Sequence, residues 1–271
     1  MKLKIALISA FVMMMMPQTE VFAQKNKFTG TGIVAHRGFW NCEEAGFARN
    51  SIASLRCAQE AGVWGSEFDV NMTADSVLLV FHDSKIDGKR IEKHSHDTFK
   101  YFRLENGESI PTLDEYLIQA KKHPETVLVY ELKKHSCSEV EEVFVQLSIQ
   151  KLKDHELLDP SKVIFISFSK YMCERLAELL PEFTVQYLNG DLKPKNVKKA
   201  GINGIDYHHG ILRIQKKWVA KARRLGMSTN SWTVNKEGDM RAILGMKIDM
   251  LTTDNPLEAR ELMKEMEIKE L

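Results

Sequence analysis

Short runs of Val, Ile, Leu and Phe alternate with longer, helix-patterned segments from residue 33 to the end of the chain. The apolar runs predict strands that begin near residues 33, 65, 127, 163, 184, 204, 228 and 249. Strands that alternate with helices are parallel, because a helical crossover returns the chain to the same end of the sheet. Eight such units predict an α/β fold, a closed TIM (β/α)8 barrel, in one domain over residues 24–271.

The structural alternative is an open, doubly wound sheet. Such a sheet usually carries a glycine-rich phosphate loop after its first strand. Here the first strand is followed by His-Arg-Gly-Phe-Trp-Asn at residues 36–41, which lacks that pattern. The sequence therefore favours the closed barrel.

The first 23 residues have the pattern of a secretory signal peptide. Lys2 and Lys4 form a positive start, residues 5–16 are apolar, and residues 21–23 offer a cleavage site. A membrane anchor is the alternative, but the apolar stretch is well short of the roughly 20 residues that a span needs. We therefore expect export to the periplasm or the exterior, with no stable membrane anchor after cleavage.

Charge and cysteine content argue against several classes of protein. The formal net charge is +1 and acids and bases are interspersed, so no nucleic-acid partner and no polybasic membrane surface are expected. The four cysteines lie at positions 42, 57, 137 and 173. Export would permit a disulfide, but the spacing selects no pairing, and the lack of Cys-x-x-Cys argues against a zinc-thiolate site.

The second apolar run and the one that follows it predict a β-hairpin, because the segment between them is too short for a parallel crossover. A turn centred on residues 74–75 would place Asp69 opposite Val80 and Glu67 opposite His82. Glu67 and Asp69 are two residues apart and therefore face the same side of their strand. Two carboxylates and an imidazole would then share one face.

Catalytic sites of TIM barrels lie at the C-terminal ends of the strands. The polar residues at those ends come from widely separated parts of the sequence: His36, Arg37, Glu67, Asp69, Glu131, Lys133, His208, Trp232, Asn235 and Asp254. Residues 84–110 are polar and irregular, and we expect them to form a small insertion over that mouth. The convergence of these side chains on one mouth predicts an enzyme.

Glu67, Asp69 and Glu131 are candidate metal ligands. Their negative charges repel one another, so three carboxylates cannot lie close together at one mouth without a cation. Oxygen-only ligation suits Ca²⁺ or Mg²⁺. The alternative is that each carboxylate caps a helix or pairs with a neighbouring Arg or Lys.

His36 and His82 are candidates for general acid–base catalysis beside these carboxylates. Arg37 and Lys133 have the chemistry to hold a phosphate, although a local ion pair would explain each of them as well. Trp232 would either stack on a substrate or cover the barrel.

These residues lie in motifs that resemble the glycerophosphodiester phosphodiesterase family. The resemblance spans about residues 33–256 and is densest near its start. The matching motifs are His36-Arg37-Gly38, Glu67-Phe68-Asp69-Val70, His82-Asp83, Pro111-Thr112-Leu113, Glu131-Leu132-Lys133, Trp232-Thr233-Val234-Asn235 and Thr253-Asp254-Asn255-Pro256.

The resemblance implies a TIM barrel that cleaves a small-molecule glycerophosphodiester to glycerol 3-phosphate and an alcohol. Its implied site has a divalent cation on the three carboxylates, an acid–base pair of His36 and His82, and phosphate contacts from Arg37 and Lys133. We assign His36 as the base, because it adjoins the Arg37 phosphate contact, and His82 as the acid.

One motif departs from the family pattern. The family commonly has Glu-Asn-Thr where this chain has Arg49-Asn50-Ser51. Asn50 is retained and is expected to contact the substrate, whereas a base replaces the acid. Glu43 or Glu44, in the longer loop before this motif, is a candidate to supply the missing carboxylate.

Two other functions remain open. A glycoside hydrolase also uses paired carboxylates on a barrel, but it does not need two histidines and an Arg–Lys pair. A binding protein of the same fold with impaired catalysis is the non-enzymatic alternative, and Arg49 motivates it.

Overall fold

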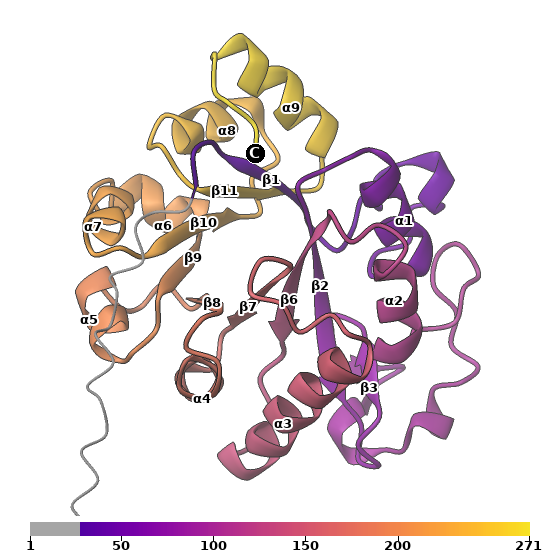
Figure 1. Ribbon diagram of the computed structural model, residues 1–271. Helices are drawn as coiled ribbons and strands as arrows, with labels where there is room; N and C mark the ends of the chain where they lie inside the picture. The colour runs from indigo at the N-terminus through magenta and orange to yellow at the C-terminus, as the bar shows by residue number, and fades with distance from the viewer. Residues whose placement is uncertain (1–27) are drawn as a thin grey trace, which may run out of the picture.

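The computed structural model describes residues 28–271 (Figure 1). Eight parallel strands form its central ring: β1 (Gly32–Ala35), β2 (Gly65–Met72), β6 (Val127–Leu132), β7 (Val163–Ser167), β8 (Thr184–Tyr187), β9 (Gly204–His208), β10 (Ser228–Trp232) and β11 (Met250–Thr253). Hydrogen bonds join them in the order β11-β1-β2-β6-β7-β8-β9-β10. Each strand begins at or next to its predicted position, and the predicted TIM barrel is confirmed.

β10 and β11 lie side by side and close the ring through side chains as well as backbone. The N–H of Val234 donates to the carbonyl of Thr252 at 3.0 Å. The Asp249 carboxylate accepts from the backbone and the hydroxyl of Thr229, at 2.9 and 2.8 Å. The Asn230 amide adds a bond to the Thr252 hydroxyl at 2.9 Å. Side-chain hydrogen bonds thus replace part of the ladder at this seam, and the barrel is nearly closed.

The helices lie outside the ring (Figure 1). They are α1 (Ile52–Glu60), α2 (Leu113–Ala120), α3 (Ser138–Asp154), α4 (Lys170–Leu179), α5 (Pro194–Lys199), α6 (His209–Ile214), α7 (Trp218–Arg224), α8 (Glu237–Leu244) and α9 (Pro256–Glu265). Ser51 caps α1 by accepting from the N–H of Ser54, as its position before an apolar helix predicts. α6 and α7 are separate helices, because the backbone leaves the helical region at Gln215, where ψ is 48°.

Alternation of side chains along β2 separates the core from the barrel interior. Phe68 faces outward and stacks on Tyr116 of α2 with ring centroids 4.5 Å apart, and Val70 joins the same core cluster. Glu67 and Asp69 therefore point the other way, into the barrel. Burial of a Phe side chain stabilises a fold by about 1.5–3 kcal/mol. The apolar core thus fixes the orientation of the two carboxylates.

β2 and β3 (Leu78–Val80) form the predicted hairpin, but the predicted register is wrong by one residue. Val70, and not Asp69, lies opposite Val80. The hydroxyl of Thr73 accepts from a backbone N–H four residues further on, at 3.0 Å, and this bond holds a turn one residue longer than expected. Glu67 consequently does not lie opposite His82.

Residues 84–110 form the predicted small insertion. It contains β4 (Lys85–Ile86), β5 (Lys89–Arg90) and the 3₁₀ turns η2 (Ile91–Lys93) and η3 (His96–Thr98). Its apolar residues form a separate small core with the end of β3 and the loop before α1: Ala48, Leu79, Ile86, Ile91, Phe99, Leu104 and Ile110. This core anchors the insertion next to the barrel mouth.

The predicted signal peptide, residues 1–23, lies outside the described residues. Across residues 28–271, no helix combines the length and the apolar character needed to cross a membrane. All four cysteines carry free thiols in the structure.

Candidate active site

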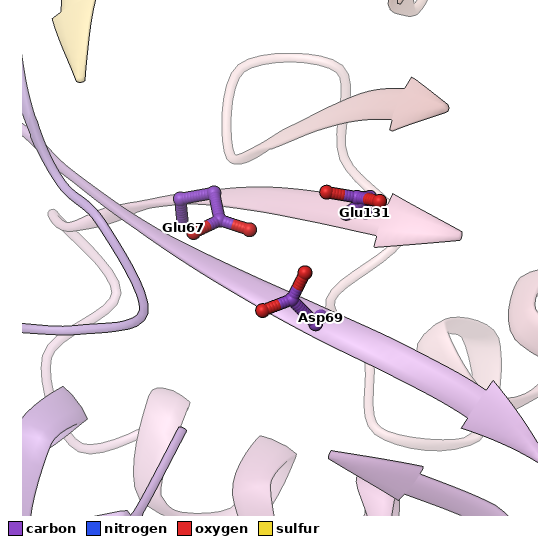
Figure 2. A group of neighbouring side chains, drawn as sticks. All are labelled: Glu67, Asp69 and Glu131. Atoms are coloured by element: carbon purple, nitrogen blue, oxygen red, sulfur yellow. The ribbon is translucent and has the colours of Figure 1, made fainter. Parts of the chain in front are cut away.

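Three carboxylates converge inside the mouth of the barrel (Figure 2). Glu67 and Asp69 lie on β2, and Glu131 lies directly beside Asp69 on the neighbouring strand β6. One oxygen from each carboxylate lies within 4.8 Å of the others, and all three residues are buried. The predicted ligand cluster therefore exists as a group of neighbouring oxygens, which is the kind of donor set that Ca²⁺ and Mg²⁺ prefer.

The charges in this cluster shift one another's titration. Burial raises the pKa of Glu67 well above its usual value, and the charges of Asp69 and Glu131 raise it further. Burial also raises the pKa of Glu131 to about 7. For Asp69, burial is outweighed by Lys133, His82 and Arg37, which hold its pKa below the usual value. Burial and mutual repulsion thus disfavour the ionised forms of Glu67 and Glu131, which a divalent cation would favour.

Two cationic side chains lie against the carboxylates. Lys133 Nζ is 2.7 Å from Glu131 Oε1 and 3.1 Å from Asp69 Oδ1. Arg37 Nε is 3.5 Å from Asp69 Oδ2, and the backbone N–H of Arg37 donates to Glu67 Oε2 at 2.8 Å. Both cations line the same pocket as the carboxylates. Their charges are available at the mouth to an anionic group such as a phosphate.

His36, which follows β1, is held by a carboxylate that follows the neighbouring strand β11. Its Nδ1 lies 2.8 Å from Asp254 Oδ1, which also accepts from Trp40 Nε1 at 2.9 Å. Asp254 Oδ2 accepts from Asn235 Nδ2 at 2.6 Å. Burial acts to raise the pKa of Asp254, but these three hydrogen bonds outweigh it and lower the pKa. An ionised carboxylate only accepts hydrogen bonds, so Nδ1 carries a hydrogen, and in the neutral ring this leaves the lone pair on Nε2.

His82 follows the end of β3 and reaches the mouth from the hairpin. Its Nδ1 lies 2.6 Å from Asp83 Oδ1. Burial lowers the pKa of His82, Lys133 and Arg37 add to this effect, and Asp69 opposes it. A lower pKa makes the protonated imidazole a stronger acid. His82 and His36 line one pocket with the three carboxylates.

The chain matches a known family over most of its length. Residues 36–258 match the model of the glycerophosphoryl diester phosphodiesterase family. The chain belongs to this family. Both the predicted enzyme class and the resemblance seen in the motifs are confirmed, and the family is metal-dependent.

Solved and curated relatives agree with this assignment. A crystal structure of a glycerophosphodiester phosphodiesterase from Parabacteroides distasonis is 41% identical, covers 88% of this chain and 98% of its own, and has a TM-score of 0.84. A glycerophosphodiester phosphodiesterase from Caldanaerobacter subterraneus subsp. tengcongensis is 25% identical over 83% of this chain and 95% of its own. An Oleispira antarctica phosphodiesterase, solved in complex with the product sn-glycerol-3-phosphate, shares the fold at 23% identity, a TM-score of 0.73, and coverage of 87% of this chain and 97% of its own.

Asn50 of the phosphodiesterase contacts Asp69 with both ends of its amide. Its Nδ2 donates to Asp69 Oδ2 at 2.8 Å, and its Oδ1 accepts from the backbone N–H of Asp69 at 3.1 Å. The residue adopts a left-handed conformation with φ of 57°, which asparagine tolerates better than most residues. Asn50 thus orients one of the three carboxylates, and the predicted contact with the substrate stays a prediction.

Trp232 packs among aromatic rings at the rim of the pocket. Its ring lies edge-on to Phe168 and His208, with centroids 5.5 and 5.3 Å away, and its Nε1 donates to the carbonyl of Asp206 at 3.0 Å. The ring therefore covers part of the barrel mouth, and it also lines the pocket. Its predicted contact with the substrate stays a prediction.

Neither Glu43 nor Glu44 supplies the carboxylate that the family commonly has at the position of Arg49. Glu43 and Glu44 lie in the 3₁₀ turn η1 (Glu43–Ala45), are exposed, and are not part of the carboxylate cluster. The idea that one of them replaces the missing acid is therefore wrong. Arg49 instead stacks on Trp40, with its Cζ 3.8 Å from the ring centroid.

Two functional neighbours escaped the sequence analysis. Asp254 was recognised as a polar strand-end residue and as part of a matching motif, but not as the partner of His36, although the two residues follow adjacent positions of the paired strands β1 and β11. Asp206 was not recognised at all. It is buried on β9 and lines the catalytic pocket, and its Oδ1 has no hydrogen-bond partner within residues 28–271. A lone Asp inside an apolar strand was the available signal.

Proposed function

We propose that this phosphodiesterase hydrolyses glycerophosphodiesters to glycerol 3-phosphate and an alcohol with a divalent cation, Ca²⁺ or Mg²⁺, held by Glu67, Asp69 and Glu131. One observation carries the proposal: three buried carboxylates share a pocket with two histidines, Arg37 and Lys133. The donor set is entirely oxygen, and burial and mutual repulsion raise the pKa values of Glu67 and Glu131, which a bound cation would lower again.

Arg37 and Lys133 bind the phosphate of the substrate. One is a guanidinium and the other an ammonium group, both lie at the edge of the carboxylate cluster, and each has hydrogens left for an oxygen of the phosphate. A cation bound to the carboxylates supplies further stabilisation of the negative charge on the phosphate. The two side chains thereby favour the transition state, in which charge builds up on the phosphate oxygens.

His36 acts as the general base. Its Nε2 lone pair accepts the proton of the attacking oxygen, which belongs to water or to the neighbouring glycerol hydroxyl. As the ring becomes positively charged, the carboxylate of Asp254, 2.8 Å from Nδ1, stabilises it. Asp254 is therefore a positioning residue that also holds the ring in the tautomer that a base requires.

His82 acts as the general acid. The negative charge of a diester beside the ring favours the protonated form of His82, and burial, which lowers its pKa, makes that form a ready proton donor. The proton goes to the oxygen of the departing alcohol as the bond between that oxygen and phosphorus breaks. Asp83, 2.6 Å from Nδ1, orients the ring.

A panel of diesters assayed with and without a chelator tests the proposal. We expect hydrolysis of at least one glycerophosphodiester with release of glycerol 3-phosphate, and loss of that activity in excess chelator that added Ca²⁺ or Mg²⁺ restores. Full activity in chelator would contradict the role of the cation. Failure to cleave any diester in the presence of either cation would favour an impaired binding protein.

We also propose that the enzyme works outside the cytoplasm. The support is the sequence of residues 1–23, with its positive start, apolar stretch and cleavage site. Expression of the full chain in a bacterial host, followed by cell fractionation and N-terminal sequencing, tests this. The expected mature protein begins near residue 24, and an intact N-terminus in the cytoplasmic fraction would contradict the proposal.

A further inference from the structure

A second cavity adjoins the catalytic pocket. Its volume is about 320 Å³, against about 120 Å³ for the catalytic pocket, and the two share Arg37 and His82. Residues 102–105 of the insertion form its outer wall. A proton donor must contact the leaving oxygen. His82 faces both cavities. The departing alcohol, which receives its proton from His82, would therefore lie in the larger cavity, with the phosphate beside Arg37.

Two arginines line the larger cavity in addition to Arg37. Arg49 is held by stacking on Trp40, with its Cζ 3.8 Å from the ring centroid. Arg103 is held by its own backbone, because its Nη1 donates to the carbonyls of Lys100 and Phe102, each at 2.8 Å. Within residues 28–271, neither arginine forms an ion pair with a carboxylate. Both guanidinium groups therefore keep donors for a ligand.

Two carboxylates also line this cavity, but they do not balance the arginines. Asp83 is 2.6 Å from His82 Nδ1 and is engaged there. Glu105 is exposed and, among residues 28–271, forms no ion pair. Two arginines thus face one uncommitted carboxylate, so the local charge attracts an anion.

On the basis of the proposed diesterase function, we propose that this cavity is the leaving-group subsite and that it selects an alcohol bearing an anionic group such as a carboxylate. The planar forks of Arg49 and Arg103 match a carboxylate and donate two hydrogen bonds each. A cationic alcohol such as choline would bring its charge beside both arginines. The substrate class of this enzyme is then a glycerophosphodiester with a negatively charged head group.

Three diesters of one series test the proposal: glycerophosphoglycerate, glycerophosphoglycerol and glycerophosphocholine. The first two differ chiefly by a carboxylate, so the ratio of their kcat/KM values reports its recognition. We expect the glycerate ester to be favoured about 10-fold or more over the other two in the native enzyme. Arg49→Ala and Arg103→Ala should each lower the ratio of glycerate to glycerol ester by about 3- to 10-fold, the range for charged hydrogen bonds that are partly exposed.

Arg56→Ala is the matched control, since Arg56 is an exposed arginine on α1 that pairs with Glu60 and does not line the cavity. It should leave the ratio as in the native enzyme. Glu105→Gln should not lower hydrolysis of the glycerate ester. If the glycerophosphocholine ester is preferred, or if the two arginine variants leave the ratio at its native value, the anionic subsite is refuted. If none of the three esters is cleaved with either cation, the diesterase function itself fails instead.

Discussion

Replacement of Asp254 by Asn separates the charge of this side chain from its shape. Asp254 accepts from His36, Trp40 and Asn235. An amide of the same size has one accepting and one donating end. If its oxygen faces His36 and Trp40, its nitrogen meets the Asn235 Nδ2 donor. If it is turned round, its nitrogen meets the Trp40 Nε1 donor, and His36 must give up its hydrogen at Nδ1.

The geometry sets the size of the effect. The first orientation keeps the base tautomer of His36 but replaces a carboxylate, 2.8 Å from Nδ1, with a neutral oxygen. A hydrogen bond to a charged group contributes about 1.5–3 kcal/mol, and about 1.4 kcal/mol corresponds to a factor of ten. Asp254→Asn should therefore lower kcat/KM by about 10- to 150-fold. The second orientation removes the base, and it would give the larger loss of about 10²–10⁴-fold.

Steady-state assays on a glycerophosphodiester and on a nitrophenyl diester measure this effect. A base is needed for both substrates, so Asp254→Asn should lower both rates by similar factors. Asp83→Asn is the matched variant at His82. Asp83→Asn affects the general acid, His82. It should therefore lower the rate of hydrolysis of the natural diester more than that of the nitrophenyl diester, whose leaving group departs as a stable anion.

A double variant distinguishes charge from orientation. Adding Asn235→Asp to Asp254→Asn restores a donor–acceptor pair at the 2.6 Å contact but moves the negative charge one side chain away from His36. Thermal stability should recover while the rate stays low. Recovery of the native rate in the double variant, or a loss smaller than about threefold in Asp254→Asn, would refute the role of charge at this position.

Three further predictions concern the cation and the histidines. Glu67→Gln, Asp69→Asn and Glu131→Gln should each abolish diester hydrolysis in a protein that still unfolds cooperatively. Added Ca²⁺ should raise the melting temperature of the native enzyme more than that of these variants. An equal rise would contradict the role of these residues as ligands. Because the pKa of Glu131 is raised to about 7, the cation must displace a proton from this carboxyl below that pH. Calorimetry should show the affinity for the cation falling about tenfold for each unit by which the pH is lowered, for each proton displaced. A pH-independent affinity would count against this prediction. His36→Ala should lose about 10²–10⁴-fold on both natural and nitrophenyl diesters, whereas His82→Ala should keep much of its activity on the nitrophenyl diester; the reverse pattern would exchange the two roles.

The barrel and the carboxylate cluster followed from short-range patterns. The apolar runs mark the strands, and their two-residue period places Glu67 and Asp69 on one face whatever the rest of the chain does. The structure adds the parallel register that places Glu131 beside Asp69. These inferences held because burial of alternate residues leaves a strand little freedom of register.

The hairpin register did not follow from such patterns. It depends on the hydroxyl of Thr73 bonding to a backbone N–H across the turn, which lengthens the turn by one residue. Side-chain bonds of this kind compete with the tightest turn, and their outcome is not visible in the hydrophobic pattern. The wall that the insertion contributes to the larger cavity was likewise beyond reach, since it depends on tertiary packing of its own small core.

The balance of charge explains why the site combines three carboxylates with two cationic side chains. When ionised, Glu67, Asp69 and Glu131 carry three negative charges, which Arg37 and Lys133 reduce to one. A divalent cation would leave the pocket with one positive charge, and a phosphodiester carries one negative charge. With all three carboxylates ionised, the charges of these five side chains would therefore sum to zero with cation and substrate only when both are bound. Each of them lowers the electrostatic cost of burying the other, so the arrangement favours the ternary complex over either partial one.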